Sequence, residues 1–463
     1  MDDAKASASI VALIVCVSLI HSEQNLLAPN LSAVAETLGL NAAEKDEWLG
    51  GGLAVALFMV GGPAAMLVGI GADSASYRRV DLLVLVLLLG TAGCAGSALA
   101  STYDQLFLAR SLTGVSLGGA LPLSFSLLGD LVGPARRTAF SGRLGLAMHA
   151  GAASGQSLAG FVGPWLGWRF PFGFVALLML LLAAWVRAFM EEPPRREQQA
   201  LLPMHRAERR YASTTLGSVV VGAGRAFRSF VALLRVRTVC LIFLQGIPGC
   251  VPWGVIGAFL PDFLHKDAGY SVEGATAIIS MFSLGGVLGV FIGGEGGQYL
   301  YNRYSPRAPA ALMLAAGSLG SLPMYVLVAH PPTDAMATCM LLAACGGALA
   351  TITGPNVRAT LTNVTHGQQR GLAFASFALF DDVGKGAGPA IIAILIQRFG
   401  RRATFAAAMF GWVPCAVLNG LTAHTVVADQ QRAARAAGCG DTHGESSSTP
   451  VTAALLEHDD RSE

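Results

Sequence analysis

Residues 80–101 read VDLLVLVLLLGTAGCAGSALAS, and Asp81 is the one charged side chain among them. An α-helix rises 1.5 Å per residue, so about 20 apolar residues cross the roughly 30 Å hydrocarbon core of a bilayer. The stretch is long enough to cross and is apolar on all sides. We therefore predict that it forms a membrane-spanning helix.

Apolar stretches of similar length recur along the rest of the chain. Hydrophobic residues make up 53% of the 463 residues and charged residues only 13%, with a mean hydropathy of +0.55. Charged residues run near a quarter in soluble proteins. We predict an all-α membrane protein with about twelve spans, at residues 8–38, 48–72, 80–101, 105–132, 138–165, 169–190, 238–264, 271–300, 308–329, 335–363, 369–397 and 402–424.

Several classes of function are disfavoured by the sequence. The formal net charge of +2 is too small to indicate nucleic-acid binding. The eight cysteines are scattered singly without metal-ligand spacing, so we expect neither a metal nor a cofactor. Phosphate-loop, zinc-protease and nucleophile-elbow motifs are absent, which argues against an enzyme. The bilayer, a transported solute and possible coupling protons are the partners that we expect, for a monomer.

A polar, arginine-rich segment at 191–236 divides the chain. We predict an N-terminal six-helix bundle at 1–190, a basic cytosolic linker at 191–236, a C-terminal six-helix bundle at 237–424 and a disordered cytosolic tail at 425–463. A repeat supports two similar halves, because GIGADSASYRR at 69–79 resembles GGEGGQYLYNR at 293–303. Paired helical repeats are typical of transporters, in which the solute path lies between the halves.

Lys and Arg indicate the orientation. Most of them, including the linker arginines, fall in loops on the side of the termini, so both termini should face the cytosol. Arg398, Arg401 and Arg402 fall on the other side, against the rule. The sequence leaves open whether the membrane is the plasma membrane or an endolysosomal one.

Two motifs in the first half resemble the major facilitator superfamily. Gly69-x3-Asp73-x4-Arg78-Arg79 resembles its loop signature after the second helix, and Arg110-x3-Gly114-x3-Gly118 resembles the signature of its fourth helix. The likeness extends to about residue 424. It implies that Asp73, Arg78 and Arg79 latch the two halves in one access state, and that Arg110 takes part in coupling.

Finer matches resemble the Spinster-like lipid transporters of that superfamily. They are Glu23-Gln24-x3-Ala28, QGIPGCVPWG at 245–254, GPNVRA at 354–359 and DDVGKGAGP at 381–389. Gln24 stands where that family has Arg, and Leu117 stands near the place of an expected acid. The resemblance implies a transporter of lysolipid or sphingoid-type amphiphiles.

Ionisable residues inside the predicted spans are candidates for function, since a charge at the bilayer centre costs about 2.5–3.5 kcal/mol on insertion scales. Glu23 can act as a proton- or cation-responsive acid, or it can be a structural acid paired with Arg110. Arg110 itself is predicted near the outer end of its span, where its side chain can snorkel. Gln24, the polar residue next to Glu23, is a further candidate for solute binding or coupling.

In the second half, Arg358 is a candidate ligand for a phosphate or carboxylate, with Asn356 beside it. Its alternative role is an anchor at the inner end of the tenth helix. Gly354 and Pro355 interrupt that helix, and with Pro248 and Pro252 they are predicted hinges.

Three charged residues follow in the eleventh span. Each is predicted to bind the solute or to couple solute transport to a gradient. Asp381 and Lys385 are spaced i,i+4 and can neutralise each other. Asp382 is left to pair across the cavity with Arg358. His149 and Trp253 are expected to be packing groups.

We therefore predict a secondary transporter that works by alternating access on a lysolipid or sphingoid-type amphiphile. One alternative is a proton-coupled transporter of a small organic anion or sugar that uses Glu23. Another is a membrane sensor of the same fold that does not transport.

Overall fold

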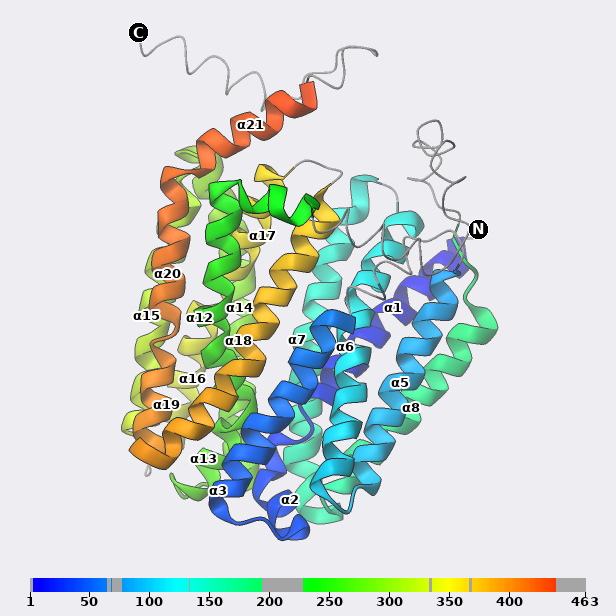
Figure 1. Ribbon diagram of the computed structural model, residues 1–463, viewed down its shortest axis with the longest axis vertical. Helices are drawn as coiled ribbons and strands as arrows, with labels where there is room; N and C mark the ends of the chain where they lie inside the picture. Colours follow the sequence, from blue (N-terminus) through cyan, green and yellow to red (C-terminus); the bar gives the residue numbers. More distant parts are fainter. Residues whose placement is uncertain are drawn as a thin grey trace.

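A computed structural model describes residues 3–64, 68, 77–132, 134–193, 228–332, 335–365 and 369–438. Ten described segments are long and apolar enough to cross a membrane. Helices α7 and α18, of 33 and 30 residues, are not among these ten, but they pack against helices that are, α7 against α1 and α18 against α12. Both ends of the described chain lie at the same end of the bundle (Figure 1). We call this end the termini face and the opposite end the distal face. The predicted all-α membrane fold is confirmed.

The helices follow the predicted spans closely. Those of the first half are α1 (Asp3–Gln24), η1 (Ala28–Asn30), α2 (Leu31–Leu38), α3 (Ala42–Glu44), η2 (Lys45–Gly52), η3 (Val55–Met59), α5 (Arg79–Leu99), α6 (Tyr103–Leu131), α7 (Pro134–Leu166) and α8 (Arg169–Phe189). Those of the second half are α12 (Arg237–Ala258), α13 (Leu260–Lys266), α14 (Val272–Arg303), α15 (Ala308–Ala329), α16 (Met336–Thr351), α17 (Thr353–Val364), α18 (Arg370–Phe399), α19 (Arg401–Met409), α20 (Trp412–Leu421), η6 (Thr422–His424) and α21 (Val426–Gly438).

Each half has its own apolar interior. Among the described residues, one buried cluster is built from side chains between Ala12 and Met190, and two others from side chains between Leu233 and Val426. The halves meet along three seams: α7 against α14, η2 and η3 against α18, and η1 against α13. Two separately packed bundles with limited seams can move as bodies relative to each other.

Local signals in the sequence explain where the distal turns occur. Helix α2 ends at Gly39, whose φ of 68° is the left-handed conformation that glycine adopts without strain. Asn41 and Glu44 then form a capping box that starts the second span at Ala42, earlier than predicted.

The second span is wound as π-helix in η2 and η3. Gly50 and Gly51 let it approach Phe259 and the backbone of Ala390 in the other half so closely that a Cβ would press against both. Such wide turns often mark functional segments, and here the π-helix lies on a seam between the halves.

One prediction about the elements is corrected, and the two copies of the repeat can be placed. The tail is not disordered from residue 425, because α21 is an ordered helix whose Asp429 accepts hydrogen bonds from the Thr238 backbone and hydroxyl. The second copy of the repeat, 293–303, forms the end of α14, which extends three residues beyond the predicted span. Of the first copy, only residues 77–79 lie within the described residues.

Candidate functional site

Four charged side chains of the second half gather where α17 and α18 face the first half. The Lys385 Nζ lies 3.8 Å from Asp382 Oδ1, one turn away on α18. Asp381 points to the other side, against Gly246 of α12, and lies within electrostatic range of Arg358. Lys385 is therefore in direct contact with Asp382, while Asp381 lies within electrostatic range of both Lys385 and Arg358.

The N-terminal half forms the opposite wall of this group. Lys385 Nζ lies 5.9 Å from the centre of the Phe58 ring, within range of a cation–π interaction. Gly386 packs against Phe58 and Met59, and the Asp382 carboxylate faces Gly62 on the second span. The charges thus lie at the seam between the halves.

These side chains remain accessible. The Lys385 side chain is 31% exposed and that of Asp382 is 23% exposed, and Arg358 is more than a third exposed. Charges without full pairing are costly to bury, so partial exposure lowers the cost of keeping these side chains at the seam between the two bundles. We name Arg358, Asp381, Asp382 and Lys385 the crevice cluster.

Two histidines of the first half belong to the same region. His21 on α1 lies within electrostatic range of Lys385, and His149 on α7 lies within range of Arg358. His21 also makes a 2.8 Å contact between Nδ1 and the Val17 carbonyl. His149 was predicted to be a packing residue, and the spacing of a single histidine gave no sign that it faces an arginine of the other half.

Glu23 lies in a different environment. It is fully buried among α1, α5 and α6, where Thr113 Oγ1 donates a 2.6 Å hydrogen bond to its Oε1. Among the described residues, neither its Oε2 nor the buried Ser116 hydroxyl has a hydrogen-bond partner, and both atoms lie beside Gly90. Glu23 is thus within the first bundle and apart from the crevice cluster.

Arg110 caps the end of α1, inside the first span. Its guanidinium donates to the backbone carbonyls of Glu23 and Gln24, at 3.3 and 3.1 Å, and lies 5.8 Å from the centre of the Phe172 ring. The last carbonyls of a helix lack intrahelical donors, and a cation there also meets the negative end of the helix dipole. The prediction that Arg110 snorkels is wrong, because the residue is 2% exposed.

The remaining candidates lie near helix interruptions. Asn356 is buried and donates to the carbonyls of Gly293 and Ile352, so its amide joins α14 to the tenth helix. That helix is broken at Ile352, just before Gly354 and Pro355. Pro248 and Pro252 lie inside α12.

The latch residues are only partly described. Asp73 lies outside the described residues. Arg78 lies 3.9 Å from Asp81, whereas Arg79 is 3% exposed and pairs with Asp130 and Glu192 at 2.6 and 2.8 Å. Neither partner of Arg79 belongs to the second bundle, so in this structure its contacts do not latch the two halves together.

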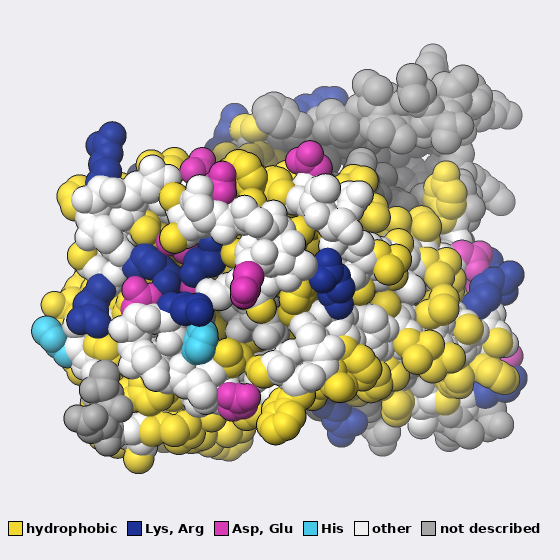
Figure 2. All heavy atoms as spheres, turned by 90° about the horizontal axis from the view of Figure 1, so that it is seen from below, with side chains coloured by type: hydrophobic (Ala, Val, Ile, Leu, Met, Phe, Trp, Pro, Cys, Tyr) yellow, Lys and Arg dark blue, Asp and Glu magenta, His cyan; other side chains and the backbone are white. Residues whose placement is uncertain are grey.

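A charged network that we did not predict joins the halves at the distal face. Lys45 Nζ lies 2.7 Å from Asp262 Oδ2, and Arg401 Nη2 lies 2.6 Å from the same oxygen. Arg401 also contacts Asp267 at 2.5 Å and Asp46 at 3.5 Å. Basic and acidic side chains lie next to one another on this face (Figure 2). We name these five residues the distal network.

The seventh span ends at Ala258 in the structure and not at 264 as predicted, so α13 and the turn after it lie outside the span. The contacts of the distal network explain the pKa shifts of the two acids there. Burial alone would raise the pKa of Asp262, but the Lys45 and Arg401 charges hold it below its ordinary value. Burial raises the pKa of Asp267, although Arg401 opposes the rise. Asp262 is therefore the firmly ionised centre of the distal network.

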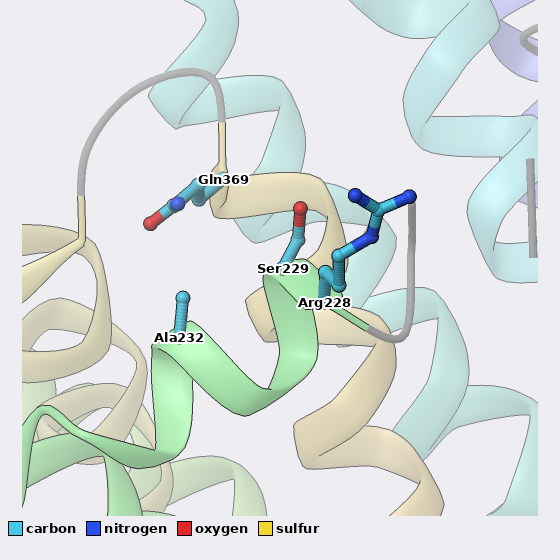
Figure 3. A pocket seen from close by; sticks show the side chains of 4 residues that line it. All are labelled: Arg228, Ser229, Ala232 and Gln369. Carbon is cyan, nitrogen blue, oxygen red and sulfur yellow. The ribbon is translucent and has the colours of Figure 1, made fainter. Parts of the chain in front are cut away.

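A pocket of about 390 Å³ lies near the termini face, lined by Arg228, Ser229, Ala232 and Gln369. Its side chains come from the segment before α12 and from the start of α18 (Figure 3). None of them belongs to the crevice cluster or to the distal network.

Comparisons with known proteins bear on the fold and the activity. The sequence profile of the Major Facilitator Superfamily matches residues 13–389. A Haemophilus influenzae protein named for metabolite transport is 25% identical over 348 residues, 72% of this chain and 78% of its own. The 4-hydroxybenzoate transporter PcaK of Acinetobacter baylyi is 27% identical over 288 residues, 56% of this chain and 57% of PcaK, so the match spans little more than half of that relative.

Solved structures agree on the architecture. The crystal structure of a bacterial homologue of the human lysosomal transporter Spinster, inward-facing and unoccupied, matches with a TM-score of 0.71 at 19% identity and covers 92% of this chain and 98% of its own. The nucleoside transporter NupG matches with a TM-score of 0.67 at 13% identity and covers 90% of this chain and 99% of its own. At these identities the likeness concerns the fold alone.

Proposed function

Because this chain belongs to the major facilitator superfamily, and so is a secondary transporter and not an enzyme, we propose that it moves an amphipathic solute with a charged head by alternating access. The observation that carries the proposal is the crevice cluster, with its accessible charges at the seam between the halves. Energy for the cycle comes from a gradient.

The head of the solute is bound by charges of both signs. Arg358 offers a planar guanidinium suited to a phosphate or carboxylate, and Lys385 adds a second cation. Asp382, facing the first half, can pair with an ammonium group. A headgroup that carries both charges, or an anionic head with neighbouring hydrogen-bond donors, fits this combination.

Apolar surface next to the charges suits the rest of the solute. Met59 is 40% exposed beside Gly386, and Phe58 lies under Lys385. Methionine thioethers adapt to irregular apolar shapes. Charged groups adjoining such a surface favour a lysolipid or sphingoid-type amphiphile, as in the Spinster-like family.

A small organic anion is the second candidate. It is favoured by PcaK, the 4-hydroxybenzoate transporter that is 27% identical to the matched part of this chain. In this case Arg358 binds the carboxylate, and protons taken up through Glu23 drive transport. The orientation that we propose, with the termini face in the cytosol, is the same for both.

Flux into vesicles tests the proposal. Purified protein in liposomes should move labelled lysophospholipid or sphingoid base, and Arg358→Ala should weaken uptake at limiting solute by tenfold or more, because a hydrogen bond to a charged group is worth about 1.5–3 kcal/mol. Arg370→Ala on the exposed start of α18 is the matched control and should leave uptake unchanged. Uptake of 4-hydroxybenzoate without uptake of amphiphiles would select the second candidate, and saturable binding without flux of either would select the sensor.

A further inference from the structure

The distal network contains more acid than base. Three carboxylates, on Asp46, Asp262 and Asp267, meet two cations, on Lys45 and Arg401. A third cation, Arg402, lies within electrostatic range of Asp267, so the network as a whole does not lack positive charge. An ionised carboxylate in a poorly hydrated place is costly unless its own oxygens are paired, so the cost of closing the distal face depends on how each acid is bonded.

Asp46 is the member that is left incompletely bonded. It is 5% exposed, and its Oδ1 accepts no hydrogen bond from any residue that the structure describes. Its Oδ2 lies 3.5 Å from Arg401 Nε in a contact too long for a good charge-assisted hydrogen bond. Asp262, by contrast, accepts from Ser32, Lys45 and Arg401.

We propose that Asp46 is a proton-binding site, and that the distal face closes with one proton from the distal compartment held on the Asp46 carboxyl. The proton passes from water to a carboxylate oxygen and is released to the same side when the face reopens. The inference rests on the alternating access of the proposed function. It assigns a second acid, separate from Glu23, to the part of the cycle that faces the distal compartment.

The charged groups around the three carboxylates determine which one takes up the proton. Arg401 lies at the start of α19, Lys45 on the same element as Asp46, Asp262 on α13 and Asp267 just after it. Asp262 keeps its charge, since the neighbouring cations lower its pKa. Asp267 contacts Arg401 at 2.5 Å with a side chain that is 31% exposed, so water and the guanidinium both stabilise its ionised form, although burial raises its pKa. Asp267 is the competitor that an experiment must exclude.

Protonation and closure are linked with a definite sign. A proton on Asp46 removes an incompletely bonded charge from the closed distal face, so closure is favoured at low distal pH and weakens as the pH rises. A single linked proton changes the ratio of closed to open molecules by at most roughly tenfold per pH unit. Asp262 cannot produce this response near neutral pH, because its lowered pKa means that it loses charge only in strong acid.

A distance measurement across the distal face tests the inference without any solute. Spin labels are attached to cysteines introduced at the exposed Ala43 and Ala403, in a protein whose eight native cysteines are replaced, and the distance distribution is recorded in liposomes between pH 5 and 8. The short-distance population should fall as the pH rises. Asp46→Asn, which mimics the protonated acid, should stay closed at every pH.

Three results would overturn the inference. They are a distance distribution that does not change with pH, an Asp46→Asn protein that still responds to pH, and an Asp267→Asn protein that has lost the response while Asp46→Asn keeps it. Exchange of sodium for N-methylglucamine at constant pH should change nothing; a shift would assign the site to a metal cation instead. Because no solute is present, failure of amphiphile uptake is a separate result.

Discussion

At the scale of single residues, the intramembrane charges occupy two kinds of environment. Glu23 and Arg110 are fully buried, and the Arg110 guanidinium donates hydrogen bonds to the carbonyls of Glu23 and Gln24. Arg358 and Lys385 are accessible at the seam between the halves. A buried acid with one unbonded oxygen is suited to holding a proton, whereas accessible cations are suited to holding a solute.

Glu23→Gln should separate proton coupling from solute binding. The amide is nearly isosteric with the acid, and its oxygen can still accept from Thr113, so the protein should fold. Accumulation driven by a pH gradient should fall at least tenfold, while exchange of solute at equilibrium should continue. Flux is measured in liposomes with and without a pH gradient. Equal loss of both fluxes would mean that Glu23 is structural.

Thr113→Val is the companion variant for Glu23. It removes the 2.6 Å hydrogen bond to Oε1 but leaves the acid in place. If Glu23 is the coupling acid, the pH dependence of transport should shift without the gradient-driven accumulation being lost. An unchanged pH profile would argue that the bond has no part in coupling.

At the scale of elements, glycine rows set how closely helices pack. Along α14, a Cβ at Gly285, Gly289 or Gly293 would collide with carbonyl oxygens of the tenth helix. Close backbone approach at small residues is how helices associate in lipid, where apolar surfaces alone give little preference. Close to Gly289, Thr351 Oγ1 donates a 2.8 Å hydrogen bond to the Gly286 carbonyl, which also holds the two helices together.

Gly289→Ala should destabilise the second bundle. The added methyl meets the Ala348 carbonyl and the Thr351 hydroxyl, and overpacking of this kind costs about 1–3 kcal/mol. The apparent Tm in detergent should drop by several degrees. Gly294→Ala on the same helix has nothing within 4 Å of its Cβ and should leave the Tm unchanged or slightly raised. A similar drop for both variants would contradict the packing explanation.

Elements were largely predictable from the sequence, but side-chain partners were not. Apolar runs gave the spans, and Gly354-Pro355 marked a helix that is in fact broken at Ile352. Spacing alone could not tell whether Lys385 pairs with Asp381 or Asp382, because both lie within one turn. In the structure, Asp381 lies against Gly246 of α12, where only a glycine leaves room for its carboxylate, and Asp382 is the acid in direct contact with Lys385. The π-helical turns also have no signal in periodicity.

At the scale of the whole molecule, the distal network explains a charge pattern that the sequence left as an anomaly. In the orientation that we propose, Arg401 lies on the side where arginine is disfavoured, but three acids surround it. Its bond to Asp262 joins residues 139 positions apart, and that of Lys45 joins residues 217 positions apart. Such partners become visible only when the two halves are placed side by side.

Asp262→Asn should open the distal face. Asp262 is 2% exposed and bonded to both Lys45 and Arg401, and removing one member of a buried charge group costs about 3–5 kcal/mol, largely because the remaining charges are left unpaired. That penalty exists only while the face is closed, since the separated side chains are hydrated when it opens. The equilibrium between access states should therefore shift by a factor of 100 or more toward the open distal face.

The same pair of labels at Ala43 and Ala403 reports this change as a longer distance at every pH, in contrast to the closed state expected for Asp46→Asn. Lys45→Met combined with Asp262→Asn removes the unpaired cation together with its partner, so the double variant should open less than the sum of the two single variants predicts. Glu47→Gln, at the exposed neighbour that contacts Gln397 at 3.3 Å, is the control and should not change the distance. Additive effects of Lys45 and Asp262, or an Asp262→Asn protein that remains closed, would show that the seams of packed helices, and not the charges, hold the distal face shut.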